Sequence, residues 1–126
     1  MYTATAAVPR AVANRSSAVM PDDPIARLRV MCGGPRDGAL LRVSLANAHL
    51  AGGDAHAAVE ELRAALRFDP GYSAAWKLLG KLHADAGDAS AAVEAYRSGI
   101  TAAVERGDKQ AEKEMRVFLR RLERAP

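Results

Sequence analysis

Three histidines are the side chains of this sequence best suited to bind a metal ion. They are His49, His56 and His83, and His49 and His83 lie 34 positions apart. If that spacing is a structural repeat, the two imidazoles lie on neighbouring helices about 10 Å apart, a usual distance between packed helices. Two ligands of one metal ion must be much closer, and no cysteine or carboxylate is spaced to complete a site. We predict no metal or other cofactor, with His49 and His83 packed between helices and His56 in solvent.

The sequence shows no pattern typical of a catalytic nucleophile or of a phosphate-binding loop. Cys32 is the only cysteine, which excludes an internal disulfide, and a free thiol is typical of a reducing compartment. Neither glycine segment, 33–35 or 52–54, is followed by Lys-Ser or Lys-Thr as a phosphate-binding loop requires. No serine, cysteine or lysine has a recognisable activating partner in the sequence. We therefore predict that the chain is not an enzyme.

Basic residues near the C-terminus share one side of a predicted helix. Arg116, Arg120 and Arg124 are spaced four apart. Such a face could contact the phosphates of nucleic acid or an anionic membrane surface. In the alternative the face is solvated, and Glu112 pairs with Arg116. Glu123 would pair with Arg120 in the same way. We favour the solvated face because no aromatic residues are interleaved for base stacking.

The helices that position these residues are predicted from a sequence segment that occurs twice in the chain. Residues 39–72 and 73–106 align without a gap and are identical at ten positions. The identities are Leu45 with Leu79, His49 with His83, 53–55 with 87–89, 57–60 with 91–94, and Arg63 with Arg97. A fixed period of 34 residues indicates stacked units, each burying its apolar face against the next.

Each unit is predicted to be a pair of helices. In the first unit, helices of about 37–51 and 55–68 are separated by Gly52 and Gly53, and Asp54 caps the second helix. The second unit has helices of about 73–86 and 89–105, separated by Gly87 and Asp88. The pattern predicts four antiparallel helices.

One further helix is predicted on each side of the repeats. The first opens at Asp22-Asp23-Pro24, carries Ile25, Leu28 and Met31 on one stripe, and ends at 32–35. The second spans 108–124, after a stop at Gly107 and a cap at Asp108. Its apolar stripe consists of Ala111, Met115, Phe118, Leu119 and Leu122. Two repeats between flanking helices meet the usual minimum for a stable stack.

The pattern resembles the tetratricopeptide repeat, a helix–turn–helix unit. The matching signature residues are Trp76, Leu79, Gly80, Gly87, Ala92 and Tyr96 in the second unit, and Leu45, Ala46, Gly53, Ala58, Ala65 and Pro70 in the first. Arg42 replaces the tryptophan of the first unit, and His49 and His83 replace a tyrosine. Val104 replaces the closing proline, which should let the last repeat helix continue for another turn. The resemblance implies an all-α, right-handed solenoid of helical hairpins, similar to small bacterial proteins without an assigned activity.

The resemblance also implies a binding surface, because the first helix of each repeat lines the concave face in this family. The residues that map to it are Val43, Asn47, Leu50, Lys77, Lys81 and Asp85. Lys77, Lys81 and Asn47 could hold an acidic or carboxylate-ending peptide, with Val43 and Leu50 as an apolar floor. The full clamp that some members use for chaperone tails is absent, since only Asn47 and Lys77 match it. Alternatively, the lysine pair serves solubility.

These observations predict a non-catalytic interaction module, or adaptor, that binds a peptide or a partner domain. Two alternatives stay open. The first is a homodimer formed through apolar surface on the first short helix or the last helix. The second is a weak binder of nucleic acid or an anionic surface through the last helix.

The two ends of the chain account for its positive charge. The net charge is +3 and the pI about 9.4, while the repeats are close to balanced. Residues 1–21 carry Arg10 and Arg15 and no acid, and are predicted to be a disordered leader. Such a composition also fits an organellar transit peptide, or a native start at Met20 rather than Met1. No segment approaches the roughly 20 apolar residues of a membrane span. We predict a cytoplasmic location, or an organellar one if 1–19 is a transit peptide.

Overall fold

The computed structural model describes residues 23–125, which form six α-helices and no strand. The helices are α2 (Pro24–Arg29), α3 (Ala39–Ala51), α4 (Ala55–Phe68), α5 (Ser73–Asp85), α6 (Ala89–Arg106) and α7 (Lys109–Arg124). The predicted all-α fold of two helical hairpins with flanking helices is confirmed. The predicted leader and the choice between Met1 and Met20 lie outside the described residues.

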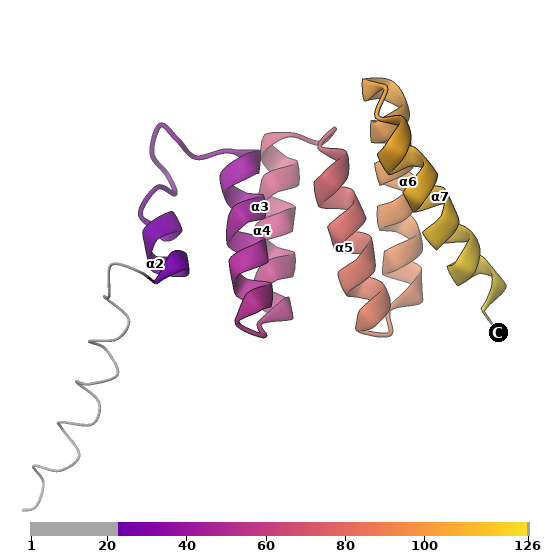
Figure 1. Cartoon of the computed structure of the whole chain (residues 1–126), viewed down its shortest axis with the longest axis horizontal. Coiled ribbons are helices and arrows are strands. Elements are labelled where there is room, and N and C mark those ends of the chain that lie inside the picture. Colours follow the sequence, from indigo (N-terminus) through magenta and orange to yellow (C-terminus); the bar gives the residue numbers. More distant parts are fainter. Residues whose placement is uncertain (1–22, 126) are drawn as a thin grey trace, which may run out of the picture.

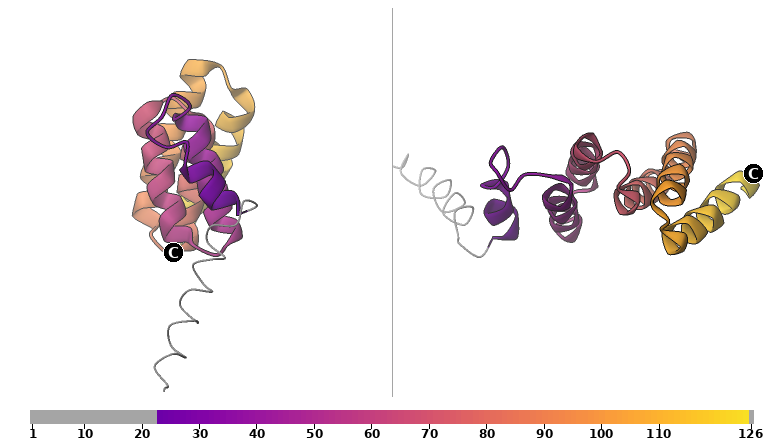
Figure 2. Two further views of the ribbon diagram at one scale, coloured as in Figure 1. Left: turned by 90° about the vertical axis from the view of Figure 1, so that its left-hand side faces the viewer. Right: turned by 90° about the horizontal axis from the view of Figure 1, so that it is seen from above.

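The helices from α3 to α7 stand side by side in chain order (Figure 1). Viewed from above they form two layers, with α3, α5 and α7 on one side and α4 and α6 on the other (Figure 2). Among the helices that the structure describes, none combines the length and the apolar character that crossing a membrane requires.

Aspartates cap three of these helices in the same way. The carboxylates of Asp54, Asp88 and Asp108 accept hydrogen bonds of 3.0–3.1 Å from backbone N–H groups three residues further on. Gly53 and Gly87 precede the first two of these aspartates with φ near +80°, a conformation that costs glycine little. The predicted breaks and caps are therefore confirmed, and α4 has the predicted bounds.

Several helix ends differ from the prediction, among them the end of α6, which lies at Arg106 rather than at about 105. Helix α2 ends at Arg29 rather than near Cys32, because the segment after it turns toward α3. Helix α3 begins at Ala39 rather than Asp37, whose carboxylate instead binds Arg42 and the backbone N–H of Gly33. Helix α5 ends one residue early, at Asp85.

Helix α6 is longer than its counterpart in the first repeat. It has 18 residues, whereas α4 has 14, and its last turn includes Val104 in place of the expected proline. Gly107 stops it in the left-handed conformation, with φ of 72°. Both features confirm the predicted extension and stop.

The core consists of two clusters that share the half-buried Trp76. One consists mainly of residues of α3, α4 and α5, with Ala95 of α6, and includes the fully buried Leu62. The other lies between α6 and α7 around Met115. Trp76 packs against both, and its Nε1 donates a 2.7 Å hydrogen bond to the carbonyl of Pro70. The ring therefore links the two repeats, as the repeat interpretation requires.

Arg42 takes a different role at the equivalent position of the first repeat. Its guanidinium donates two hydrogen bonds of 2.9 Å to Asp37 and one of 3.0 Å to Glu61 on α4. Glu61 also pairs with Arg29 of α2, at 3.2 Å. The Glu61 side chain is only 8% exposed, so two arginines neutralise a nearly buried carboxylate. This network attaches α2 to α3 and α4 at the N-terminal end of the described stack.

Candidate partner-binding surface

The structure places the predicted groove residues of the first repeat on α3. Val43 and Leu50 are half-buried and pack against the first core cluster, and Asn47 is exposed. The apolar pair therefore has a structural role as well as a partly accessible surface. Asn47 has no hydrogen-bond partner within residues 23–125, so its amide is available to a ligand.

The two predicted lysines are each engaged with a carboxylate. Lys77 pairs with Glu114 of α7, and Lys81 pairs with Asp85 one turn further along α5 at 2.8 Å. The hydrogen bond from Lys77 is the main cause that lowers the pKa of the Glu114 carboxyl. The lysines therefore do not form an unpaired basic patch, and Lys77 instead attaches α7 to α5.

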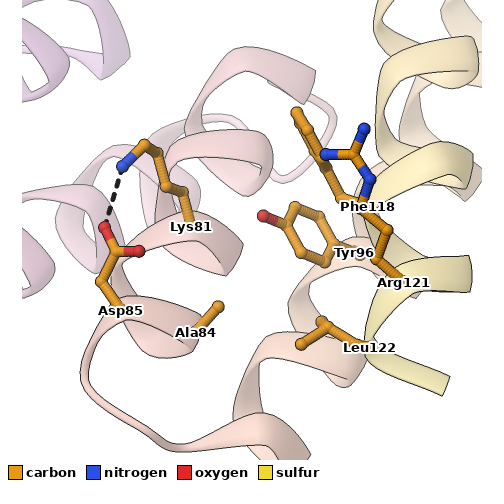
Figure 3. Close-up of a pocket in the computed structure, with 7 residues that line it drawn as sticks. All are labelled: Lys81, Ala84, Asp85, Tyr96, Phe118, Arg121 and Leu122. Carbon is orange, nitrogen blue, oxygen red and sulfur yellow. Dashed lines mark hydrogen bonds and ion pairs between the residues drawn. The ribbon is translucent and has the colours of Figure 1, made fainter. Parts of the chain in front are cut away.

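A hollow lies between α5 and α7 on the same face as these lysines, with α6 beneath it (Figure 3). We call it the α5–α7 hollow, and its volume is about 230 Å³. It is lined by Lys81, Ala84, Asp85, Tyr96, Phe118, Arg121 and Leu122. Two predicted groove residues, Lys81 and Asp85, therefore lie at its edge. The other four line none of this hollow.

Tyr96 of α6 forms the floor of the α5–α7 hollow. Its ring packs over Gly80 of α5 and against Phe118 of α7, with ring centroids 5.6 Å apart. The residue is 3% exposed, and its hydroxyl points toward Lys81 (Figure 3). The family pattern includes Tyr96 as an aromatic residue that packs in the core. Here it also supplies the one polar atom on an apolar floor.

The charges around the hollow sum to +1. Lys81 and Asp85 neutralise each other, and Arg121 lies over the ring of Phe118, 5.9 Å from its centroid. Arg121 has no carboxylate partner within the described part of the chain. Burial raises the pKa of the Tyr96 hydroxyl, and the negative charge of Asp85 raises it further. The hydroxyl is therefore protonated at neutral pH and can donate a hydrogen bond.

The histidines are arranged as expected for packing. His49 is nearly buried, and its Nε2 lies 3.2 Å from the guanidinium of Arg29. His83 is half-buried and His56 exposed. Within residues 23–125, no group of three histidine, cysteine, aspartate or glutamate side chains could hold a metal ion.

One of the two ion pairs predicted on the last helix is wrong. Glu112 pairs with Arg116 as predicted. Glu123 instead pairs with Arg97 of α6, at 2.9 Å, rather than with Arg120 on its own helix. The acidic side chain bridges α6 and α7 because the two helices pack against each other, which spacing within one helix cannot reveal.

Sequence reasoning missed the contribution of α7 to this surface. The predicted capping stripe includes Phe118 and Leu122, whereas the predicted basic face of Arg116, Arg120 and Arg124 does not include Arg121. The order of the helices could have indicated this contribution. Helix α7 follows α6 as α5 follows α4, so it lies where the first helix of a third repeat would lie. Helix α7 therefore lines the same face as α3 and α5.

Comparison with known proteins supports the repeat interpretation. A family model described as tetratricopeptide repeat matches residues 39–82. The TPR repeat-containing protein PA0015 of Pseudomonas aeruginosa is 53% identical over 89 residues, which cover 71% of this chain and 85% of that protein. The solution structure of protein BPP2914 from Bordetella parapertussis is similar, with 47% identity and a TM-score of 0.67. That similarity covers 79% of this chain and 87% of the Bordetella chain.

Proposed function

The chain belongs to the tetratricopeptide repeat family, whose repeats generally mediate protein–protein interaction, and we propose that it is a non-catalytic adaptor that binds an acidic peptide segment. The binding surface is the face of α3, α5 and α7. The observation that carries the proposal is the α5–α7 hollow, which combines an apolar floor with a net charge of +1 from Lys81, Asp85 and Arg121.

The surface is preformed, which favours binding without a large rearrangement. Helix α7 is held against its neighbours by the Lys77–Glu114 and Arg97–Glu123 ion pairs and by the buried Met115. A partner that contacts only three lining helices buries little area, so its dissociation constant is expected on the order of micromolar.

Charge reversal on α5 tests this proposal. The double variant Lys77→Glu with Lys81→Glu, used as bait in a pull-down from the source cell, should lose the partners that wild type captures. The matched control reverses two exposed arginines of α4, Arg63→Glu with Arg67→Glu, and should retain them. Because Lys77 also contacts α7, circular dichroism must show that the double variant is folded. A folded double variant with unchanged capture would contradict the proposal.

Self-association is a second candidate, favoured by apolar residues exposed at the N-terminal end of the stack. Val30, after α2, is 81% exposed and Leu40, on α3, is 70% exposed. Sedimentation velocity over a hundredfold range of concentration should then show a dimer in wild type and a monomer in Val30→Ser with Leu40→Ser. A wild-type protein that stays monomeric throughout excludes this candidate.

A further inference from the structure

The hydroxyl of Tyr96 is a buried polar group without a hydrogen-bond partner among the described residues. It has no hydrogen bond to any atom of residues 23–125, although the residue is only 3% exposed. Leaving a buried hydroxyl unpaired is unfavourable, so such groups usually have a partner from protein, water or ligand. In the α5–α7 hollow the hydroxyl lies at the floor and points into the space that a ligand would fill (Figure 3).

The direction of this hydroxyl is fixed by packing. A Cβ atom at Gly80 would stand 2.5 Å from the ring atom Cε1 of Tyr96, so the ring lies directly on the helix backbone. Phe118 holds it from the side of α7. A rigid donor loses little entropy when it forms a hydrogen bond, which suits a recognition site.

The surrounding charges select an anionic acceptor for that hydrogen bond. Among the described residues, Arg121 is the cation of the hollow without a carboxylate partner, whereas Lys81 is neutralised by Asp85. A ligand carboxylate in the hollow would therefore gain its attraction from Arg121, across the hollow from the Lys81–Asp85 pair (Figure 3). The hydroxyl is in its protonated form there, since burial and Asp85 both raise its pKa.

The shape of the hollow limits the rest of the ligand. A volume of about 230 Å³ lies below the roughly 300–1,000 Å³ of sites for drug-sized molecules. Phe118, Leu122 and Ala84 supply an apolar wall. The space therefore suits one aliphatic side chain rather than a large cofactor.

We propose that the α5–α7 hollow binds a partner segment in which an aliphatic residue is followed by an acidic one. The aliphatic side chain contacts Phe118 and Leu122, and the carboxylate accepts hydrogen bonds from Tyr96 and Arg121. This inference rests on the proposed function, because it names the segment that the adaptor recognises. The chain's own residues 1–21 are a poor occupant, since they contain no acid.

The test uses the full-length protein, labelled with ¹⁵N, and ten-residue Gly-Ser peptides that carry Leu-Glu at their centre. Millimolar Leu-Glu peptide should shift the amide signals of α5 and α7 near the hollow. Leu-Gln and Ser-Glu peptides should bind several-fold more weakly. Equal binding of the Leu-Gln peptide overturns the carboxylate contact, and the absence of any shift with Leu-Glu overturns the inference. Loss of capture by the α5 charge-reversal variant would then still support the proposed function.

Two conservative variants, one at Tyr96 and one at Arg121, test the proposed contacts with the ligand carboxylate. Tyr96→Phe should weaken Leu-Glu binding roughly tenfold, because a hydrogen bond to a charged group is lost. Its melting temperature should be unchanged or higher, because the missing hydroxyl had no hydrogen bond to residues 23–125. The control Tyr72→Phe removes a hydroxyl outside the hollow and should bind as wild type. A lower melting temperature of Tyr96→Phe would show an internal partner and overturn the inference.

Arg121→Gln should weaken binding of the Leu-Glu peptide about threefold, as for an exposed charge pair. Its control is the adjacent Arg120→Gln, which changes the net charge equally but lies outside the hollow. Equal effects of the two variants overturn the contact with Arg121. A concentration-dependent dimer that Tyr96→Phe abolishes would identify a second copy as the occupant, and also overturns the inference.

Discussion

Gly80 of α5 lies directly under the ring of Tyr96 on α6. A Cβ atom added at Gly80 would stand 2.5 Å from Cε1 and 2.7 Å from Cδ1 of that ring. The close approach of helix backbone and ring both joins the two helices of the second repeat and sets the direction of the Tyr96 hydroxyl. A residue that the family pattern uses for packing thus also shapes the proposed binding surface.

Gly80→Ala is therefore expected to destabilise the protein despite the better helix propensity of alanine. Overpacking in a core costs typically 1–3 kcal/mol, against a gain of about 1 kcal/mol from replacing a helical glycine. We expect a net loss of roughly 1 kcal/mol in the free energy of unfolding measured in urea. Gly52→Ala is the control, because its φ is −88° and the nearest atom would lie at 3.6 Å. Equal stability of the two variants would contradict the contact.

Glu61 is expected to be the acidic residue whose loss costs the most at the N-terminal end of the stack. Glu61→Ala leaves Arg42 and Arg29 without their shared partner, and we expect a loss of roughly 1–3 kcal/mol in urea unfolding. The neighbouring Glu60→Ala removes an exposed carboxylate paired with Arg63 and should cost less than about 0.5 kcal/mol. Similar costs at the two positions would show that the buried network contributes nothing.

Acid should weaken the attachment of the loop before α3. Hydrogen bonds from Arg42, and a further one from the backbone of Gly33, hold the pKa of Asp37 well below its usual range. The folded-state pKa is lower than the unfolded value of about 3.9, so the stabilisation is complete above that pH. It is lost as the pH falls from about 4 toward the folded-state pKa.

Asp37→Asn should accordingly melt at a lower temperature than wild type at pH 7, and the difference should shrink at pH 2. The control is Asp85→Asn, whose exposed carboxylate pairs with Lys81 on the same helix and should change the melting temperature little at either pH. Melting followed by circular dichroism at both pH values provides the comparison. A difference between Asp37→Asn and wild type that is the same at both pH values would contradict this account.

Local signals explain why most of the fold could be predicted. Asp54 binds a backbone N–H only three residues away, and Gly53 needs only its own conformational freedom, so both act in any context. The start of α3 could not be predicted in this way. Asp37 has the residue type of a helix start, but its carboxylate binds Arg42 within a network that reaches to Glu61, 19 positions beyond Arg42.

The candidate site was predicted less completely for a similar reason. Lys81 and Asp85 follow from the position of α5 in the repeat, and both lie at the hollow. Phe118 and Arg121 join them only because α7 packs across α5 and α6, which the spacing of residues within one helix does not encode. The partner of Glu123 was wrong for the same reason, since Arg97 lies on another helix.

Photo-crosslinking tests the central claim, that the face of α3, α5 and α7 is the docking surface. A photoreactive phenylalanine analogue would replace Lys81 at the edge of the hollow or, as control, the exposed Glu94 on α6 in the other layer. After irradiation in the source cell, we predict covalent adducts to a partner at position 81 and few at position 94, with the adduct mapping to an acidic segment of the partner. Adducts at position 94 that equal or exceed those at position 81 would contradict the claim.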